Sequence, residues 1–174
     1  MSDFLEAARR DKLDALMARG VAPFAYRFER SASARAAHDG FREGDESVHR
    51  LAGRLAALRP HGKSTFAHLE DASGRLQLYF KQDQLGEAYE TLQLLDLDDH
   101  LGVEGPLFKT RSGEITLRVD RFQLLAKALR PLPRGKVDDA GARHGDLADA
   151  EMRARQRYAD LAVHPDVREI FRLR

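Results

Sequence analysis

The sequence contains no cysteine, which excludes disulfide bonds and thiolate metal sites. It also contains no apolar run long enough for a membrane-spanning helix of about 20 residues. The first residues, Met1-Ser2-Asp3-Phe4, have neither the basic nor the apolar region of a secretory signal peptide. These absences favour a reducing compartment, and we expect a cytoplasmic protein without a membrane partner.

Short motifs of the common enzyme classes are also missing. The sequence has no Gly-x-Ser-x-Gly nucleophile motif, no Walker loop and no Gly-rich dinucleotide motif. Its seven histidines do not show the spacing of zinc ligands. The acidic run Asp96-Leu97-Asp98-Asp99 lacks the calcium-loop pattern and is more simply explained as a turn. We therefore expect no active site, metal or cofactor within these residues.

Charge is distributed unevenly, although the net charge is only +1. Residues 48–81 carry six Lys or Arg and two acidic residues, and residues 106–136 carry eight and two. The residues between them, 82–105, carry seven acidic residues and no Lys or Arg. If both basic blocks belong to one sheet, they form a basic face that attracts phosphates. Ordinary solvated charge is the alternative for any single cluster.

Hydrophobic periodicity predicts helices near both ends of the chain and strands between them. Helical spacing predicts helices over 2–19, 33–41, 87–95, 149–161 and 167–173, with Gly20 ending the first and Asp149 capping the fourth. Alternation predicts strands over 48–58, 64–69, 75–81, 100–107 and 114–124. We expect a bulge at Gly53 and turns at Pro60-His61-Gly62 and Asp71-Ala72-Ser73-Gly74.

Three strands, a helix and two further strands follow one another in the order of an OB-fold, a five-stranded Greek-key barrel that commonly binds oligonucleotides. The predicted class is therefore α+β, mainly β. We expect an N-terminal helical extension over 1–46, the barrel over 47–126, and a linker with a C-terminal helix over 127–174.

Phe66 is the first candidate for binding single-stranded nucleic acid. Alternation along 64–69 places it with Ser64 and His68 on one face, opposite Thr65, Ala67 and Leu69. An aromatic ring on the polar face of a barrel can stack on a base. The residues alone do not decide between such a stacking ring and a phenylalanine covered by a loop.

Gln77 and Glu114 are candidates for hydrogen bonds to a base. Alternation along 75–81 turns Leu76, Leu78 and Phe80 inward and leaves Gln77 outward, where its amide offers both a donor and an acceptor. Glu114 starts the last predicted strand and can accept from a base N–H, with a surface ion pair as the alternative. Arg54, Arg59, Lys63 and Arg75 suit contacts to phosphates or bases, and solvated charge is the alternative for each.

Six segments, in order, resemble the class II lysyl-tRNA synthetases. They are Ala52-Gly53-Arg54, Gly62-Lys63-x-x-Phe66, Leu69-x-Asp71-x-x-Gly74-Arg75-Leu76-Gln77-Leu78-Tyr79, Leu101-Gly102-Val103-x-Gly105-x-Leu107-Phe108-Lys109-Thr110-x-x-Gly113-Glu114, Leu125-x-Lys127-x-Leu129-Arg130-Pro131-Leu132-Pro133, and Arg155-Gln156-Arg157-Tyr158-x-Asp160-Leu161. Any one segment is weak evidence, whereas six in order are specific. The Gly-Lys-x-x-Phe, Phe-Lys-Thr and Leu-Arg-Pro-Leu-Pro segments favour the lysyl group over its aspartyl and asparaginyl relatives.

The resemblance implies anticodon recognition of lysine tRNA on behalf of ATP-dependent aminoacylation. It implies that Phe66 stacks on an anticodon base and that Gln77 and Glu114 recognise the central uracil. Arg54 and Arg59 match basic positions on the same face, and Lys63, Arg75 and His68 complete the expected RNA-binding set. The resemblance also implies that the complete enzyme is a homodimer.

The chain departs from the family pattern in several places. Residues 137–143 resemble an insertion into a short linker, Asp98 stands where glycine is usual, and the C-terminal helix has Ala154 and Ala159 at usual tyrosine and leucine positions. The three class-defining motifs are missing, so we expect no lysyl-adenylate formation by this chain, and ATP and Mg²⁺ would bind only to the absent catalytic domain. We expect a fragment, with a free-standing RNA-binding module or a protein-interaction domain as alternatives.

Overall fold

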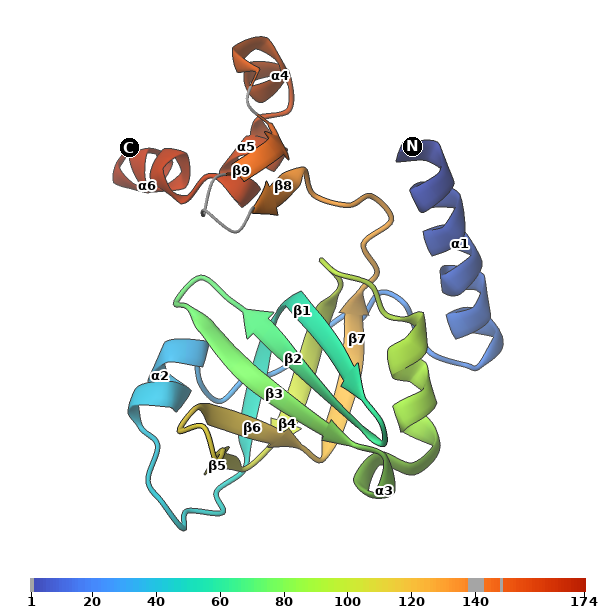
Figure 1. Ribbon diagram of the computed structural model, residues 1–174, viewed down its shortest axis with the longest axis vertical. Helices are drawn as coiled ribbons and strands as arrows, with labels where there is room; N and C mark the ends of the chain where they lie inside the picture. Colours follow the sequence, from blue (N-terminus) through green and yellow to red (C-terminus); the bar gives the residue numbers. More distant parts are fainter. Residues whose placement is uncertain (1, 138–142, 148) are drawn as a thin grey trace. The chain divides into compact units, whose positions relative to one another are not determined.

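The computed structural model describes residues 2–137, 143–147 and 149–174 (Figure 1). The chain divides into two compact units, residues 1–130 and residues 131–174. Most of the insertion expected over 137–143 lies outside the described residues.

The first unit is built on one sheet of seven strands in the order β5-β6-β3-β2-β1-β4-β7. The strands are β1 (His49–His61), β2 (Ser64–Glu70), β3 (Arg75–Lys81), β4 (His100–Gly105), β5 (Leu107–Lys109), β6 (Ile115–Val119) and β7 (Arg121–Ala126). The prediction of five strands was therefore wrong in number, because each of the last two expected strands is broken into two. One break falls at Pro106, which has no N–H to donate to a ladder, and the other falls at Asp120.

The two breaks lie against each other and join the ends of the sheet. The Arg118 N–H donates to the Pro106 carbonyl at 2.9 Å, and the Asp120 N–H donates to the Glu104 carbonyl at 2.8 Å. At the same place a Cβ on Gly105 would lie 1.8 Å from the Arg118 carbonyl oxygen, so only glycine permits this approach. Since β3 also pairs in parallel with β6, the strands follow the connection order predicted for an OB-fold.

The β1–β2 hairpin is longer than expected. Strand β1 continues through Pro60, which pairs with Thr65, and the turn is the two-residue Gly62-Lys63 with a φ of 58° at Gly62. Proline is tolerated there because β4 pairs only with the first half of β1. The bulge lies between Leu55 and Ala57, so the expected bulge at Gly53 was wrong.

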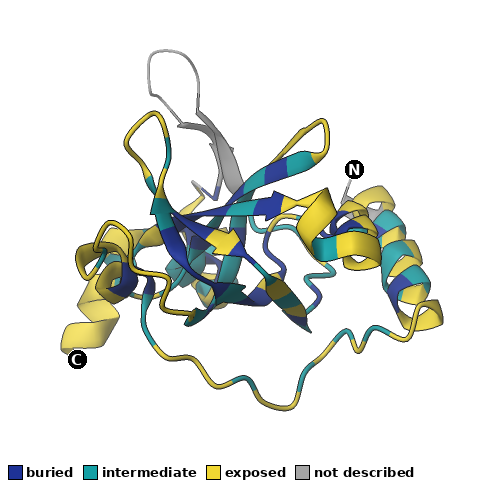
Figure 2. Ribbon diagram, turned by 90° about the horizontal axis from the view of Figure 1, so that it is seen from below, coloured by how far each residue is buried: buried dark blue, intermediate teal, exposed yellow. Residues whose placement is uncertain are grey.

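The core of this unit lies inside the curved sheet, where inward-facing strand residues alternate with partly exposed ones (Figure 2). Leu76, Leu78 and Phe80 of β3 are at most 2 % exposed, as alternation predicted. The helix expected over 87–95 is instead a short α-helix, α3 (Gln82–Leu85), followed by the 3-10 helix η1 (Gly86–Leu94). The Tyr89 hydroxyl of η1 shares a buried 2.9 Å hydrogen bond with the Thr65 hydroxyl of β2.

Two helices precede the sheet, as predicted. Helix α1 (Ser2–Ala18) ends before Gly20, which has a φ of 75°, and Ser33 caps α2 (Ala34–Asp39). Asp71 ties α2 to the expected β2–β3 turn, since its carboxylate accepts from the N–H groups of Ala34 and Ser73 at 2.9 Å and 2.7 Å. Burial raises the pKa of Asp71, but these bonds and that of the Ser73 hydroxyl outweigh it and lower the pKa below its ordinary value.

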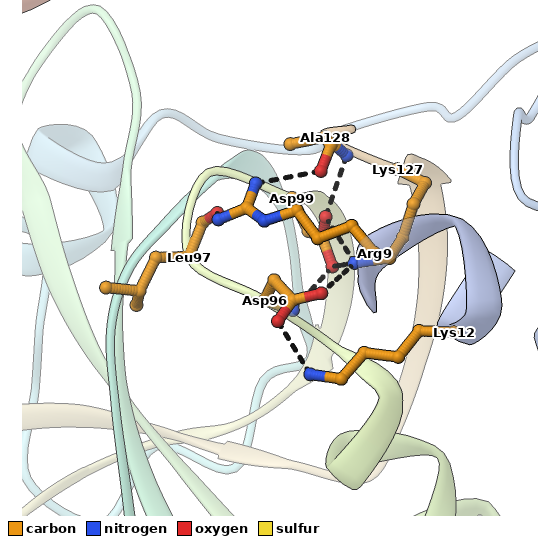
Figure 3. A network of polar contacts seen from close by, with 7 residues as sticks. All are labelled: Arg9, Lys12, Asp96, Leu97, Asp99, Lys127 and Ala128. Carbon is orange, nitrogen blue, oxygen red and sulfur yellow. Dashed lines mark hydrogen bonds and ion pairs between the residues drawn. The ribbon is translucent and has the colours of Figure 1, made fainter. Parts of the chain in front are cut away.

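Helix α1 is fastened to the sheet by a network of polar contacts around Asp96 and Asp99 (Figure 3). Lys127, whose side chain is fully buried, lies 2.6 Å from Asp96 and 2.9 Å from Asp99. From α1, Lys12 reaches Asp96 at 2.6 Å, and Arg9 donates to the carbonyls of Leu97 and Ala128 at 3.1 Å and 2.8 Å. The acidic run is therefore the turn into β4 that the sequence predicted, held by cations of this chain.

In its described residues, the second unit has a β-hairpin and three short helices. Strands β8 (Arg134–Val137) and β9 (Arg143–Asp146) pair antiparallel, followed by α4 (Ala150–Arg155), α5 (Arg157–Val163) and α6 (Pro165–Leu173). Asp149 caps α4 by accepting from the Met152 N–H at 2.7 Å, as predicted. The single helix expected over 149–161 was wrong, because the chain leaves helical geometry at Gln156.

Buried Asp160 holds the turn between α4 and α5 together by accepting from Arg153 at 2.7 Å, from Arg157, and from His164 at 2.8 Å. Among the helices that the structure describes in both units, none is long and apolar enough to cross a membrane.

Candidate nucleic-acid interface

Strands β2, β3 and β6 place the main candidates on one outer face of the sheet. Their register puts Phe66 opposite Tyr79, His68 opposite Gln77, and Gln77 beside Thr116. Inward-facing Thr65, Ala67 and Leu69 are buried, which confirms the alternation predicted for β2. The short ladder thus brings an aromatic pair and a group of polar side chains next to each other.

Three aromatic rings form a row across this face. The Phe66 and Tyr79 ring centroids lie 4.9 Å apart with a tilt of 44°, and those of Tyr79 and Phe108 lie 6.0 Å apart with the planes at 68°. All three rings are half-buried. Phe66 therefore presents part of its ring on the outer face of the sheet.

The row of rings lies in a hollow of about 830 Å³. Its lining includes Arg59, Ser64, Phe66, Gln77, Tyr79 and Phe108. Among the described residues that line it, the fully ionised side chains are Arg59 and Arg111. An aromatic floor with cations beside it suits flat, electron-rich rings joined by phosphates.

Gln77 is outward on its strand, as predicted, but it is only 8 % exposed. Its Nε2 donates to Glu114 Oε2 at 2.7 Å, and its Oε1 accepts from the Thr116 hydroxyl at 2.8 Å. A solvated strand glutamine, the alternative that the sequence left open, is thereby excluded. One N–H and one oxygen lone pair remain for a ligand in the hollow.

Glu114 is held in place from both its backbone and its side chain. Its N–H donates to the Thr110 hydroxyl at 3.0 Å, and its carbonyl accepts from the Thr110 N–H at 3.0 Å. Its carboxylate contacts Gln77 and also His68, whose Nε2 lies 3.3 Å from Oε1. A carboxylate with about four acceptor positions keeps room for a further donor.

The predicted basic residues are only partly brought together. Arg59 pairs opposite Phe66 and lines the hollow, while Lys63 is exposed in the adjacent turn. Arg54 and Arg75 instead lie opposite Glu70, four residues or roughly 13 Å along β2 from Phe66. The Arg75 guanidinium lies 3.3 Å from the Glu70 carboxylate.

Arg54 also acts on its cross-strand neighbour His100. Burial lowers the pKa of the His100 imidazole below its ordinary value, and repulsion from the Arg54 guanidinium lowers it further. His100 therefore stays neutral to a lower pH than an exposed histidine.

The first basic block and residues 106–126 of the second belong to one sheet and its turns, whereas Arg134 and Lys136 lie in β8 of the other sheet. The basic face is therefore narrower than the composition of the two blocks suggests. Lys127 is buried against Asp96 and Asp99, and the Arg118 guanidinium lies 3.0 Å from the Glu46 carboxylate. Over the described part of the chain, no group of three or more His, Cys, Asp or Glu side chains could hold a metal ion.

Four residues of the face were missed from the sequence: Tyr79, Phe108, Arg111 and Thr116. Tyr79 could have been found, because it shares the outward alternation of Gln77. Thr116 could also have been found, because it lies two residues after Glu114 on the same predicted strand. Phe108 could not, since it lies beyond the strand break at Pro106.

Comparison with known proteins agrees with this geometry. Residues 49–125 match the family model described as an OB-fold nucleic acid binding domain of the tRNA anticodon type. The chain is similar to proteins named lysine–tRNA ligase from Carboxydothermus hydrogenoformans (44 % identical, covering 98 % of this chain and 33 % of the relative) and Christiangramia forsetii (47 %, covering 95 % and 30 %).

A third such relative, from Pelotomaculum thermopropionicum, is 42 % identical over the whole chain and 35 % of its own length. The chain thus spans about a third of the length of the curated relatives it matches. Strand topology, the family match and these identities together show that residues 49–125 belong to the OB-fold tRNA anticodon-binding domains, as found in homologues of lysine–tRNA ligase.

Proposed function

We propose that the outer face of β2, β3 and β6 binds the anticodon loop of lysine tRNA and selects its central uracil. In the complete ligase this recognition would direct ATP-dependent attachment of lysine to the bound tRNA. The proposal assigns the chain a binding role and places the aminoacylation chemistry in the remainder of the enzyme.

The observation that carries this proposal is the Gln77–Glu114 pair beside an aromatic hollow. Uracil presents an N–H donor at N3 and a carbonyl acceptor beside it, whereas cytosine presents an acceptor at N3 and an amino donor. A carboxylate and an amide N–H side by side complement uracil at both positions. Cytosine would set acceptor against acceptor and donor against donor.

Affinity would come from the remainder of the face. A base stacked on Phe66 gains about 1–3 kcal/mol by the usual measure of alanine substitution. Arg59 and Arg111, at the hollow, and Lys63, in the adjacent turn, would attract the phosphates, and such contacts weaken as salt rises. The polar pair then decides which base is accepted, because an unpaired buried polar group costs about 1–3 kcal/mol.

The test is a titration of the purified chain against lysine tRNA anticodon stem-loops that differ only in a central U or C, at two salt concentrations. We expect tighter binding of the U form by about tenfold or more, and weaker binding of both forms at high salt. Equal affinity for the two forms would reduce the domain to a general binder of single-stranded RNA. Absence of binding to either form would contradict the proposal.

A further inference from the structure

Thr116 lies behind Gln77 and has no contact with solvent. It belongs to β6, where it pairs with Gln77 of β3, and it is 0 % exposed. Its hydroxyl oxygen lies 2.8 Å from Gln77 Oε1 and 3.2 Å from the backbone carbonyl oxygen of Glu114. A buried hydroxyl between two acceptors can donate a hydrogen bond to only one of them, because it has a single proton.

The other hydrogen bonds accepted by the Glu114 carbonyl indicate which acceptor the Thr116 hydroxyl uses. That carbonyl already accepts from the Thr110 N–H at 3.0 Å and lies 3.1 Å from the Thr110 hydroxyl. Gln77 Oε1 is nearer to the Thr116 hydroxyl than the Glu114 carbonyl oxygen is, and it belongs to a buried side chain. Leaving Oε1 without a donor would therefore cost more free energy than leaving the Glu114 carbonyl without this third donor. The Thr116 proton therefore goes to Gln77.

Glu114 fixes the other end of the same amide. A carboxylate only accepts hydrogen bonds, so the group at 2.7 Å from Glu114 Oε2 must be the Nε2 of Gln77 and not its oxygen. With the amide reversed, its oxygen would face the carboxylate oxygen directly. Thr116 and Glu114 thus hold the Gln77 amide from opposite ends and leave one N–H and one lone pair in a fixed direction.

We propose that Thr116 is a positioning residue for base selection, acting through Gln77 without touching the RNA; the inference rests on the proposed recognition of the central uracil. Without its hydroxyl, Gln77 Oε1 is left buried and unpaired, and the amide moves to find another donor. The second Gln77 N–H, which would donate to the uracil carbonyl, is then no longer held in a single direction. The preference for U over C therefore falls.

The experiment compares Thr116→Val, which keeps the shape but removes the hydroxyl, with Thr116→Ser, which keeps the hydroxyl. Both variants and the wild type are titrated against the stem-loops with a central U or C. We expect Thr116→Val to lose about tenfold of the U-over-C preference, the equivalent of one hydrogen bond at the upper end of its usual range. Binding of the C form should stay within about twofold, and Thr116→Ser should keep the wild-type preference.

Each outcome separates this inference from the function on which it rests. If the wild type prefers U and Thr116→Val does so equally, the positioning role is wrong while the proposed function stands. If Thr116→Ser loses as much preference as Thr116→Val, packing and not the hydroxyl is responsible, which also overturns the role. If the wild type shows no preference, the proposed function fails and the inference fails with it.

A measurement on the wild type needs no folded variant. Nitrogen-15 relaxation of the Gln77 side-chain amide should show motion as restricted as the β3 backbone in the free protein. An amide as mobile as that of the exposed Gln123 would overturn the inference whatever the variants do.

Discussion

The rings of Phe66 and Tyr79 lie 4.9 Å apart across β2 and β3, so the aromatic surface of the hollow is already assembled without RNA. A preformed surface does not have to be ordered when a ligand binds, and affinity gains accordingly. Hydrogen bonds from Gln77 to Glu114 and from Thr116 to Gln77 likewise hold the Gln77 amide in place before RNA binds. The proposed stacking and base selection therefore depend on neighbouring side chains, and substitutions can test them separately.

Phe66→Ala should weaken binding of the U and C stem-loops equally, by about 1–3 kcal/mol, because stacking does not depend on base identity. Isothermal titration with both stem-loops measures this effect. Phe4→Ala provides the matched control, since Phe4 is 77 % exposed on α1 and lies outside the hollow. Wild-type affinity in Phe66→Ala, or a loss confined to one base, would contradict the stacking role.

Gln77→Ala should reduce the preference for a central U more than it reduces total affinity. The substitution removes the amide donor but leaves Phe66 and the hollow's two arginines in place. Competition between U and C stem-loops for a limiting amount of protein measures the preference directly. Gln123→Ala, at an exposed position of β7, is the control, and an unchanged preference in Gln77→Ala would refute the assignment.

Alternation along β2 and β3 was sufficient to predict that Phe66 and Gln77 share an outer face, because both strands are regular and each has one buried side. It could not show that Gln77 is nearly buried, since that burial depends on Thr116 and Glu114 arriving from a distant part of the chain. The sequence predicted an OB-fold and the order of its main strands, but not where they break.

Register separates basic residues that the sequence placed on one face, and their role in RNA binding stays a prediction. Arg54 and Arg59 are both on β1, but only Arg59 lies opposite Phe66, and the bulge between Leu55 and Ala57 shifts the pairing between them. A sequence motif identifies which residues are present, but the pairing register of the strands determines which of them lie next to each other.

Gly105→Ala should destabilise the first unit by about 3 kcal/mol or prevent its folding, because the added Cβ would meet the Arg118 carbonyl oxygen at 1.8 Å. The backbone fixes the position of the Cβ, and the carbonyl is itself part of the backbone, so neither group can rotate away. Chemical denaturation followed by circular dichroism measures the free energy of unfolding. Gly74→Ala is the matched control, as its Cβ would meet nothing within 4 Å, and equal stability of the two variants would contradict the close approach.

Asp96 makes the stability of the first unit depend on pH. Burial raises the pKa of its carboxyl group, but the hydrogen bonds from Lys12 and Lys127 outweigh it and hold the pKa below the ordinary 3.8. A carboxyl group whose pKa is lower in the folded than in the unfolded state contributes its full stabilisation of the fold at pH values above its unfolded-state pKa. This contribution is lost as pH falls through its folded-state pKa. We therefore expect the melting temperature to fall as pH is lowered from 6 to 3.

Asp96→Asn isolates this contribution, because the amide cannot titrate. The variant should melt at a lower temperature than the wild type at pH 6, since Lys127 stays buried with one carboxylate fewer. The difference between the two should then narrow as pH falls below 3.8, because the unfolded wild type takes up a proton at Asp96 more readily than the folded wild type does. Asp71 and Asp160 also have lowered pKa values and titrate in both proteins, so their effect cancels in the difference. A gap that stays constant from pH 6 to 3 would show that Asp96 does not carry the pH dependence.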